Sequence, residues 1–338
     1  MIRYKQVSFD YAEPLVVFPS TPVAGERTNR KIAKSPQQTH AILIGERGQY
    51  QILTTVSSEK IRQLNLPLHQ SPQPQRALLG SGDFGKVKYG VNDDNKTVAI
   101  KCIKGDAALE ASRHEADILR QIRGIPGVCE LLDVITAETH THGTSPAPTT
   151  ELCTYLVQPV YPISSDDFKA YCLPEAEEPR IQLMANTAIH LITAVEMLHA
   201  RSVYHQDIKP DNIRFMKHEH PQLAYLPVLI DFGLATNHNG LVTSLEAQKG
   251  TPEFRPPEST DTTGYTPAQH DAWALTATLY TLFGGPNAID YFAYWTEHPD
   301  FWDLPVSITH ILAQMCSKNP DHRLPLADAK AQFQSLLA

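Results

Sequence analysis

The sequence lacks the cysteine pattern of a disulfide-bonded or zinc-stabilised protein. Its 338 residues include only five cysteines, which is an odd number, and none of them forms a CxxC pair. Disulfide frameworks and closed zinc sites both depend on regularly spaced cysteines. We therefore expect reduced thiols and a cytosolic location.

The sequence also lacks an excess of basic charge and a long apolar run. Acidic residues outnumber basic ones by 37 to 29, which gives a net charge of −8 at pH 7. This balance argues against a general binder of nucleic acid or of anionic membranes. No apolar run approaches the roughly 18 residues that a membrane span needs, so we expect neither a span nor a secretory signal.

What is present is typical of a globular protein of about two folding units, at roughly 150 residues per domain. Hydrophobic residues make up 42% of the chain. Two strand-like segments, residues 41–44 and 50–56, predict a hairpin, followed by a short helix over residues 57–64 and a Pro/Gln linker at residues 71–75. We expect residues 1–75 to form an N-terminal extension that packs on the domain after it.

The pattern changes after residue 78. It predicts three strands over residues 78–103, a helix over residues 106–123, and two further strands at residues 130–137 and 152–160. An exposed loop that contains His140 and His142 separates the last two strands, and these histidines are too few for a closed metal site. The rest is mostly helical, including an amphipathic helix over residues 177–200. The predicted fold class is α+β, with a small β-rich lobe that has one main helix and a larger helical lobe.

A glycine-rich loop, residues 80–87 (GSGDFGKV), lies between two of the predicted strands. Glycine lets backbone amides approach phosphate groups closely. A dinucleotide-binding fingerprint would need a helix after the loop, and a Walker loop would need Gly-Lys-Ser/Thr, so neither fits.

Lys101 ends the apolar strand VAIK, where alternation places it on the same face as Ala99. A partly buried lysine needs an anionic partner. Glu115 is the best candidate, because it lies on the inward side of the following helix, and Glu110 is the alternative. The two glutamates are about 140° apart around a helix, so they cannot both point inward.

Two polar segments follow the long helix, residues 205–212 (HQDIKPDN) and residues 230–233 (IDFG). Asn212 and Asp231 supply the hard oxygen ligands that suit Mg²⁺. Asp207 supplies an acceptor for a hydroxyl proton, and Lys209 supplies a cation for a moving phosphate.

Taken together, these motifs resemble those of the eukaryotic-type protein kinase family, serine/threonine branch, over residues ~78–335. Residues 250–258 (GTPEFRPPE) resemble the end of a kinase activation segment. Asp271 resembles the aspartate that braces the catalytic loop, and Arg323 the arginine that pairs with Glu258.

The resemblance implies a bilobal kinase fold, with residues 76–161 as the N-lobe and hinge and residues 162–338 as the C-lobe. It implies ATP and Mg²⁺ as cofactors, with metal ligands Asn212 and Asp231, and a protein substrate with Ser/Thr hydroxyls. The implied catalytic residues are Asp207, Lys209, Lys101 and Glu115. The implied ATP-binding residues are Leu79, Gly80, Gly82, Gly85, Val87, Ala99, Lys101, Pro159 and Tyr161.

Two positions depart from the family pattern. Gln206 replaces the arginine that normally pairs with a phosphorylated activation-loop residue, so we expect activity that does not depend on phosphorylation of Thr243 or Ser244 acting through it. Arg214 replaces the apolar residue that many kinases place beneath adenine, and its methylene stem could lie against the ring.

Other functions remain open on the sequence alone. They are a pseudokinase or scaffold, a small-molecule kinase, and a non-kinase nucleotide binder. Residues 250–258 disfavour the small-molecule kinase, because such enzymes generally lack this segment. The expected protein is monomeric, without nucleic-acid partners, and a bacterial protein that acts in a host cytosol is one alternative for its source.

Overall fold

The chain divides into two compact units. Unit 1 contains Met1–Asp117 and Glu130–Val160, and unit 2 contains Ile118–Cys129 and Tyr161–Ala338. A computed structural model describes residues 4–9, 18–19, 41–53, 55–56, 75–82, 85–141, 149–173, 176–218, 225–238, 240–242, 249–260, 264–284 and 304–338. Residues 118–129, which the sequence assigned to the N-lobe, belong to unit 2.

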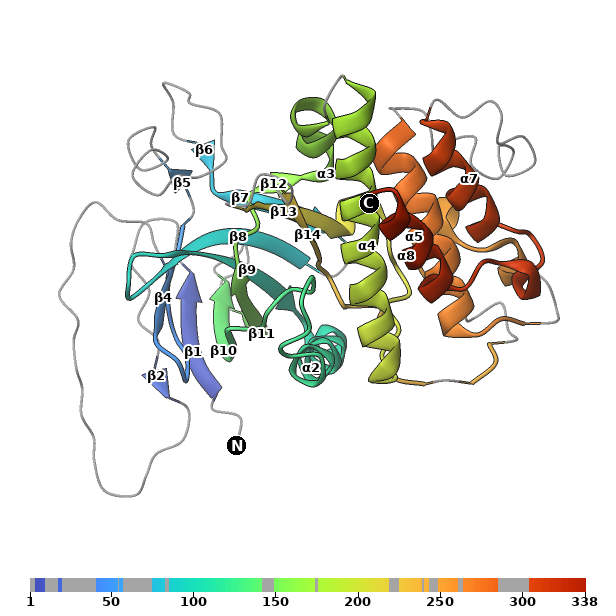
Figure 1. The fold of residues 1–338 in the computed structure, drawn as a ribbon. Helices are drawn as coiled ribbons and strands as arrows, with labels where there is room; N and C mark the ends of the chain where they lie inside the picture. Colours follow the sequence, from blue (N-terminus) through green and yellow to red (C-terminus); the bar gives the residue numbers. More distant parts are fainter. Residues whose placement is uncertain are drawn as a thin grey trace. The chain divides into compact units, whose positions relative to one another are not determined.

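Unit 1 is built on one nine-stranded sheet (Figure 1). Its strands are β1 (Tyr4–Phe9), β2 (Phe18–Pro19), β3 (Ala41–Ile44), β4 (Gln49–Ile52), β7 (Leu78–Gly82), β8 (Gly85–Asn92), β9 (Thr97–Lys104), β10 (Asp133–Thr141) and β11 (Thr149–Pro159). They run in the order β2-β1-β10-β11-β9-β8-β4-β3, and β7 also pairs with β8. Among the described strands of this sheet, only β1 and β10 pair in parallel.

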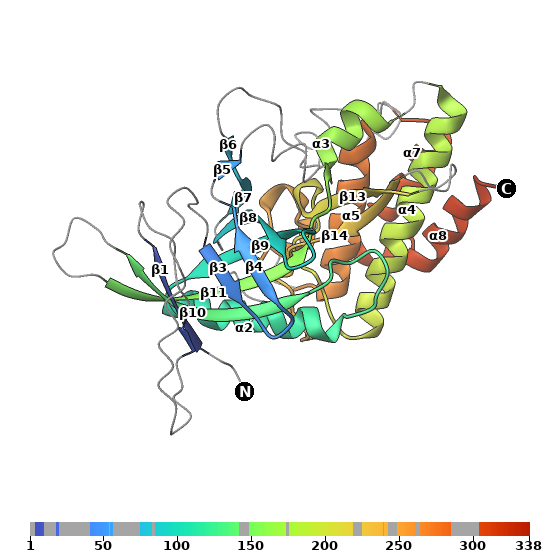
Figure 2. The same ribbon diagram turned by 90° about the vertical axis from the view of Figure 1, so that its left-hand side faces the viewer.

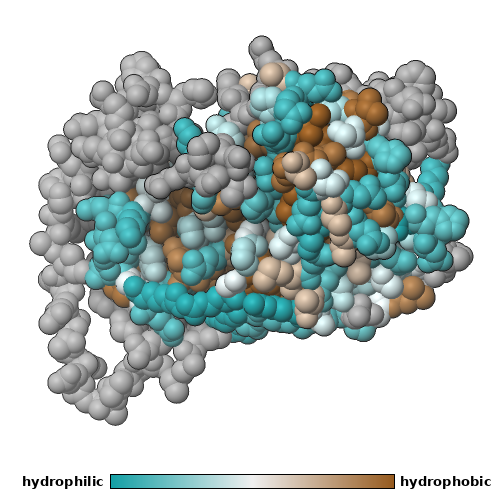
Figure 3. All heavy atoms as spheres, viewed as in Figure 1, coloured by the Kyte–Doolittle hydropathy of each residue, from teal (hydrophilic) through white to brown (hydrophobic). Residues whose placement is uncertain are grey.

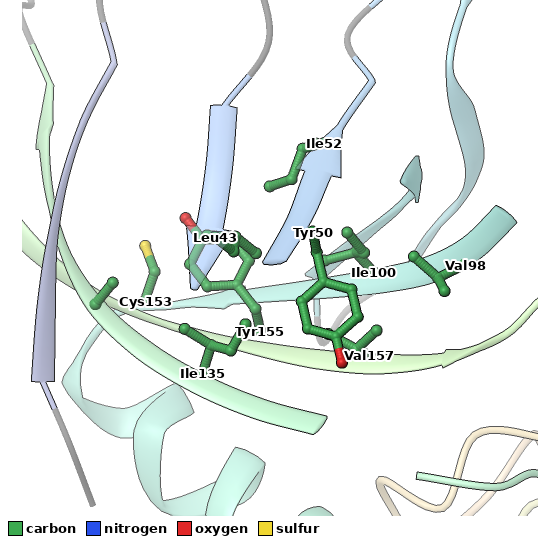
Figure 4. Packing of buried hydrophobic residues seen from close by; sticks show 10 residues of the cluster. Leu43, Tyr50, Ile52, Val98, Ile100, Ile135, Cys153, Tyr155 and Val157 are labelled. Carbon is green, nitrogen blue, oxygen red and sulfur yellow. The ribbon is translucent and has the colours of Figure 1, made fainter. Parts of the chain in front are cut away.

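The side chains of β9 alternate between the two faces of this sheet, as the sequence predicts. Val98 and Ile100 are buried in one hydrophobic cluster together with residues of β10 and β11 (Figure 4). Ala99 and Lys101 point to the opposite face because successive side chains of a strand alternate. The helix α2 (Asp106–Gln121) follows β9.

The N-terminal extension adds strands to this sheet, which Figure 2 shows from the side. The hairpin of β3 and β4 is antiparallel, and β4 pairs with the end of β8. The second predicted strand of the extension ends at residue 52, and a separate strand β5 (Thr55–Val56) pairs with β6 (Gln75–Arg76). The helix expected over residues 57–64 and the linker residues 71–74 lie outside the described residues.

The strands β10 and β11 differ from their predicted limits. β10 extends to Thr141 and β11 starts at Thr149, so the connection between them is shorter than expected. His140 therefore lies in β10, opposite Thr150, rather than in a loop. His142 lies outside the described residues.

Unit 2 is mainly helical. Its elements are β12 (Ile163–Ser164), α3 (Ser165–Asp167), η1 (Phe168–Cys172), α4 (Glu177–Ala200), η2 (Pro210–Asn212), β13 (Ile213–Lys217), β14 (Tyr225–Leu229), η5 (Pro252–Phe254), η6 (Pro257–Thr260), α5 (Pro267–Gly284), α7 (Val306–Met315), η9 (Pro320–His322) and α8 (Leu326–Ser335). The long helix α4 contacts α5, α7, α8 and β14. The strands β12, β13 and β14 form a small antiparallel sheet.

The helix α4 is long and apolar enough to cross a membrane by length and composition alone, a feature that the sequence pattern did not predict. Ten of its side chains are buried within unit 2, among them Leu191, Ile192 and Val195. A core helix passes the same test, so this is weak evidence for a span.

On the face in Figure 3, hydrophilic and hydrophobic residues are interspersed over the described surface.

Candidate functional site

A buried ion pair links β9 to α2 in unit 1. Lys101 Nζ donates to both carboxylate oxygens of Glu115, at 2.9 Å each. The two residues are 6% and 2% exposed, whereas Glu110 is exposed. The structure therefore selects Glu115 between the two candidates. A lysine ammonium group held in this way is charged and fixed in position, as a phosphate-binding cation must be.

The glycine-rich loop joins β7 to β8, in the strand–turn–strand context that the sequence predicts. Gly82 pairs with Gly85 at the described end of the hairpin. Gly85 has φ +137°, and a Cβ there would lie 2.2 Å from the backbone oxygen of Cys102. No other residue fits, so this glycine is required by the close approach of β9.

Several expected nucleotide-binding residues belong to unit 1. Leu79 lies in β7 and Val87 in β8, while Ala99 and Lys101 lie in β9. Pro159 ends β11, opposite Val98. Tyr161 is the first residue of unit 2 after this segment.

In unit 2, Asp207 is the centre of a dense hydrogen-bond network. Its Oδ1 accepts from the backbone N–H of Thr251 at 2.9 Å and from the Thr251 hydroxyl at 2.8 Å. Its Oδ2 accepts from Lys209 Nζ at 2.9 Å and from Asn212 Nδ2 at 3.0 Å. Lys209 Nζ also donates to the Thr251 hydroxyl at 2.6 Å. Four donors therefore fix the Asp207 carboxylate in one orientation.

This network sets the protonation state of Asp207. Burial would raise the pKa of the Asp207 carboxyl, but hydrogen bonds from Lys209 and Thr251 outweigh it and lower the pKa below its ordinary value. Asp207 is therefore ionised at neutral pH and can accept a proton. Since all four donors occupy its lone pairs, a substrate hydroxyl must share or displace one of them.

The loop that carries Asp207 is anchored on the fully buried carboxylate of Asp271 in α5. Asp271 accepts backbone N–H groups of His205 and Gln206 at 2.8 Å each, as well as His199 Nε2 at 3.0 Å. His205 Nε2 in turn lies 3.1 Å from the backbone oxygen of Ile230, next to Asp231. The sequence pattern identified Asp271 as a brace but missed His199, because nothing in its helix distinguishes it from a core histidine.

Asn212 and Asp231 lie at the same end of the β13–β14 hairpin, because Ile213 pairs with Leu229 and the N–H of Ile230 donates to the backbone oxygen of Asn212 at 2.9 Å. Asp231 has φ +60°, a left-handed conformation that is uncommon for non-glycine residues but that aspartate tolerates better than most.

The donor set at this end of the hairpin fits a magnesium ion. Asn212 Nδ2 donates to the backbone oxygen of Asp207 at 2.9 Å and to its carboxylate, so the side-chain oxygen of Asn212 must point away from them. This amide oxygen and the carboxylate of Asp231 are the hard ligands that Mg²⁺ takes, usually one or two from the protein with the rest from water and phosphate. Among the described residues, no group of three or more His, Cys, Asp or Glu side chains could hold a metal ion.

Gln206 occupies the position at which the family has arginine. It is 2% exposed, and its Nε2 donates to the backbone oxygen of Pro267 at 2.9 Å and to Asp271 Oδ1 at 3.2 Å. The side chain of Gln206 is therefore hydrogen-bonded to the N-terminal end of α5. The expected phosphorylation sites, Thr243 and Ser244, lie outside the described residues.

A second buried ion pair holds the segment after Thr251. Arg323 donates to both carboxylate oxygens of Glu258 at 2.6 Å, as the sequence resemblance implied. The guanidinium group of Arg323 also lies 4.9 Å from the ring centre of Trp273. Arg214, the other unusual position, lies partly buried in β13, opposite Ser164.

Comparison with known proteins identifies the family to which these features belong. The model of the protein kinase domain matches residues 74–333. CBL-interacting serine/threonine-protein kinase 10 of Arabidopsis thaliana is 27% identical over 271 residues, which cover 74% of this chain and 50% of that protein. Serine/threonine-protein kinase fused of Drosophila melanogaster is 31% identical over 216 residues, covering 62% and 24%. Probable serine/threonine-protein kinase MARK-C of Dictyostelium discoideum is 27% identical over 280 residues, covering 79% and 33%.

The chain belongs to the protein kinase family, and its β-rich and helical units fit the bilobal α+β kinase fold. Members of this family generally use ATP and Mg²⁺. The chain spans about half or less of the length of these relatives.

Proposed function

We propose that this protein is a serine/threonine protein kinase, which transfers the γ-phosphoryl group of ATP to a protein hydroxyl. The observation that carries the proposal is the network in which Lys209, Thr251 and Asn212 all bind Asp207. An ionised, oriented carboxylate beside a lysine cation suits phosphoryl transfer, in which the protein mainly positions groups and stabilises charge.

In the proposed reaction, the oxygen of the substrate hydroxyl bonds to the γ-phosphorus of ATP while the bond from that phosphorus to the β,γ-bridging oxygen breaks. ADP is the leaving group, and the hydroxyl proton passes to the Asp207 carboxylate. Lys209 would stabilise the charge on the transferred phosphoryl group, and Lys101, fixed by Glu115, would hold the α- and β-phosphates.

Asn212 and Asp231 would hold Mg²⁺, which when bound neutralises charge on the phosphates. The residues of the chain orient these two ligands: Asp207 fixes the amide of Asn212, and His205 holds the backbone of Ile230 before Asp231. This arrangement couples the metal ligands to the base through the same short loop.

Serine/threonine specificity is supported by the Lys209–Thr251 hydrogen bond, since this lysine and this threonine occur together in that branch of the family. The names of the relatives also contain "serine/threonine-protein kinase". Because the side chain of Gln206 is bound to α5 and carries no charge, we further propose that activity does not require activation-loop phosphorylation read through this position.

The test is to incubate the full chain with Mg-ATP and protein extracts and to map phosphosites by mass spectrometry. We expect new phosphoserine and phosphothreonine with the wild-type chain, and none above background with Lys101→Met or Asp207→Asn. Equal phosphorylation by wild type and Asp207→Asn would contradict the proposal and favour a scaffold role. Loss of nearly all activity in a folded Thr243→Ala/Ser244→Ala variant would refute the independence from loop phosphorylation.

A further inference from the structure

We propose that Leu53 of the N-terminal extension is a positioning residue for nucleotide binding, because Leu79 and Val160 pack against the buried cluster to which Leu53 belongs. The inference rests on the proposed kinase function. It assigns a role to a residue that lies before the region matched by the protein kinase family model, which begins at residue 74.

Leu53 is a core residue of unit 1. It is 1% exposed and belongs to a buried cluster with Ala77, Tyr89 and Val91. Leu79, at the start of the glycine-rich loop, and Val160, directly after β11, pack against this cluster. Both lie in the segments through which this chain would contact the nucleotide. The extension therefore contributes packing directly to those segments.

Backbone hydrogen bonds hold Leu53 in this cluster. Its N–H donates to the backbone oxygen of Tyr89 at 2.9 Å, and the N–H of Tyr89 donates to the backbone oxygen of Ala77 at 3.0 Å. The extension, β8 and the residue just before β7 are thus linked in one layer. A shift of Leu53 would therefore also shift Tyr89 and Ala77, and with them the residues against which Leu79 of β7 packs.

The hairpin before Leu53 is fixed on the other face of the same sheet. Leu43, Tyr50 and Ile52 are 0%, 4% and 2% exposed and pack in a separate cluster with Val98 and Ile100 of β9 (Figure 4). Ile52 and Leu53 are consecutive, yet they enter different clusters. Side chains of an extended chain alternate in direction, so Ile52 packs on one face of the sheet and Leu53 on the other.

Two aspartates of the kinase domain anchor the hairpin turn. Asp133 accepts the backbone N–H of Arg47 at 3.0 Å, and Asp93 accepts the backbone N–H of Gln49 at 2.8 Å. A Cβ on Gly45 would lie 1.9 Å from a carboxylate oxygen of Asp133, so any other residue there would displace this carboxylate. Burial, and then the charge and hydrogen bond of Asp133, raise the pKa of Tyr50 to about 12. The hairpin is therefore built into unit 1 by specific contacts.

The experiment compares four variants of the full chain: Leu53→Ala, Leu53→Met, Leu43→Ala and Ile42→Ala. Leu43 is the matched control, since it is a leucine of the same hairpin that is buried in the other cluster. Ile42 is 37% exposed and controls for loss of apolar surface alone. The melting temperature of each variant is measured first, and calorimetry with Mg-ATP, KM for ATP and kcat are then measured well below it.

We expect Leu53→Ala to raise the Kd and KM for ATP about fivefold or more, because the binding-competent position of Leu79 becomes a minority state. Its kcat should stay within about twofold, since the interaction acts on nucleotide binding and not on the chemical step. Leu53→Met, which conserves volume, should restore ATP affinity. Leu43→Ala should lower the melting temperature as Leu53→Ala does, with little change in Kd.

A Kd for Leu53→Ala within twofold of wild type would overturn the inference, and so would an equal rise in Leu43→Ala, which would indicate general loosening of unit 1. A wild-type chain that neither binds Mg-ATP nor phosphorylates protein would instead overturn the proposed function. The two failures are therefore distinguishable.

Discussion

The Thr251 hydroxyl connects the two charged groups of the proposed active site, and its removal is the sharpest test of that site. It donates to Asp207 Oδ1 at 2.8 Å and accepts from Lys209 Nζ at 2.6 Å. Thr251→Ala removes both bonds, while the backbone N–H of residue 251 still reaches Asp207. Each hydrogen bond to a charged group is worth about 1.5–3 kcal/mol.

The expected effect follows from these values. Since the retained backbone bond compensates in part, we take a loss of about 2–3 kcal/mol in the transition state, which lowers kcat about 30- to 150-fold. Thr251→Ser keeps the hydroxyl and is the matched control, with kcat expected within about fivefold of wild type. Steady-state phosphorylation of a substrate found by the phosphosite mapping would measure both.

A folded Thr251→Ala variant with kcat close to that of Thr251→Ser would refute this reasoning, because it would show that the hydroxyl bridge does not act in the reaction. The same geometry predicts that phosphorylation of Thr251 inactivates the protein. A phosphate there would place nearly two negative charges against the carboxylate of Asp207. Thr251→Glu should therefore be no more active than Thr251→Ala.

Three further predictions follow from the buried charges. Glu115→Gln should lower kcat/KM by at least about tenfold, measured in the same assay, because a charge partner of buried Lys101 is lost. Arg323→Ala should reduce the free energy of unfolding by about 3–5 kcal/mol in denaturant titration, because Glu258 is left buried and unpaired; a loss under about 1 kcal/mol would contradict this. Burial would raise the pKa of Asp271, but His199 and His270 lower it below its ordinary value of 3.8. A carboxyl whose pKa is lowered by folding contributes stability that is fully present above that ordinary value and is lost as the pH falls through the folded pKa. As the pH is lowered below 3.8, the free energy of unfolding should therefore fall less steeply in Asp271→Asn than in the wild-type chain.

The chemistry of the site was predictable because it is encoded locally. Helical periodicity favoured Glu115 over Glu110 as the inward glutamate and left Glu110 as the alternative; the structure shows Glu115 buried and Glu110 exposed. The order of the glycine loop, Lys101, Asp207 and Asp231 was sufficient to identify the family. Such motifs depend on residue type and short spacing, which a single sequence displays directly.

The role of the extension was not predictable in the same way. Alternation identified two strands before residue 57, but not the face of the sheet that they cover, because that depends on pairing with β8, distant in sequence. The end of β4 at Ile52 was also missed, since Leu53 continues the strand-like pattern and its N–H still donates to the backbone oxygen of Tyr89 in β8. Likewise, the sequence shows that Gln206 cannot bind a phosphate by charge, but not that Pro267 accepts its hydrogen bond.

Asp271 and the side chain of Gln206 together anchor the loop that carries Asp207. Asp271 accepts from the backbone of His205 and of Gln206, from the side chain of Gln206 and from His199. Gln206 has φ +65°, a conformation that costs free energy and persists only where surrounding contacts fix it. Here the Gln206 side chain supplies two of those contacts itself, to Asp271 and to Pro267. These two hydrogen bonds support the proposal that the loop does not need a phosphorylated residue bound at position 206.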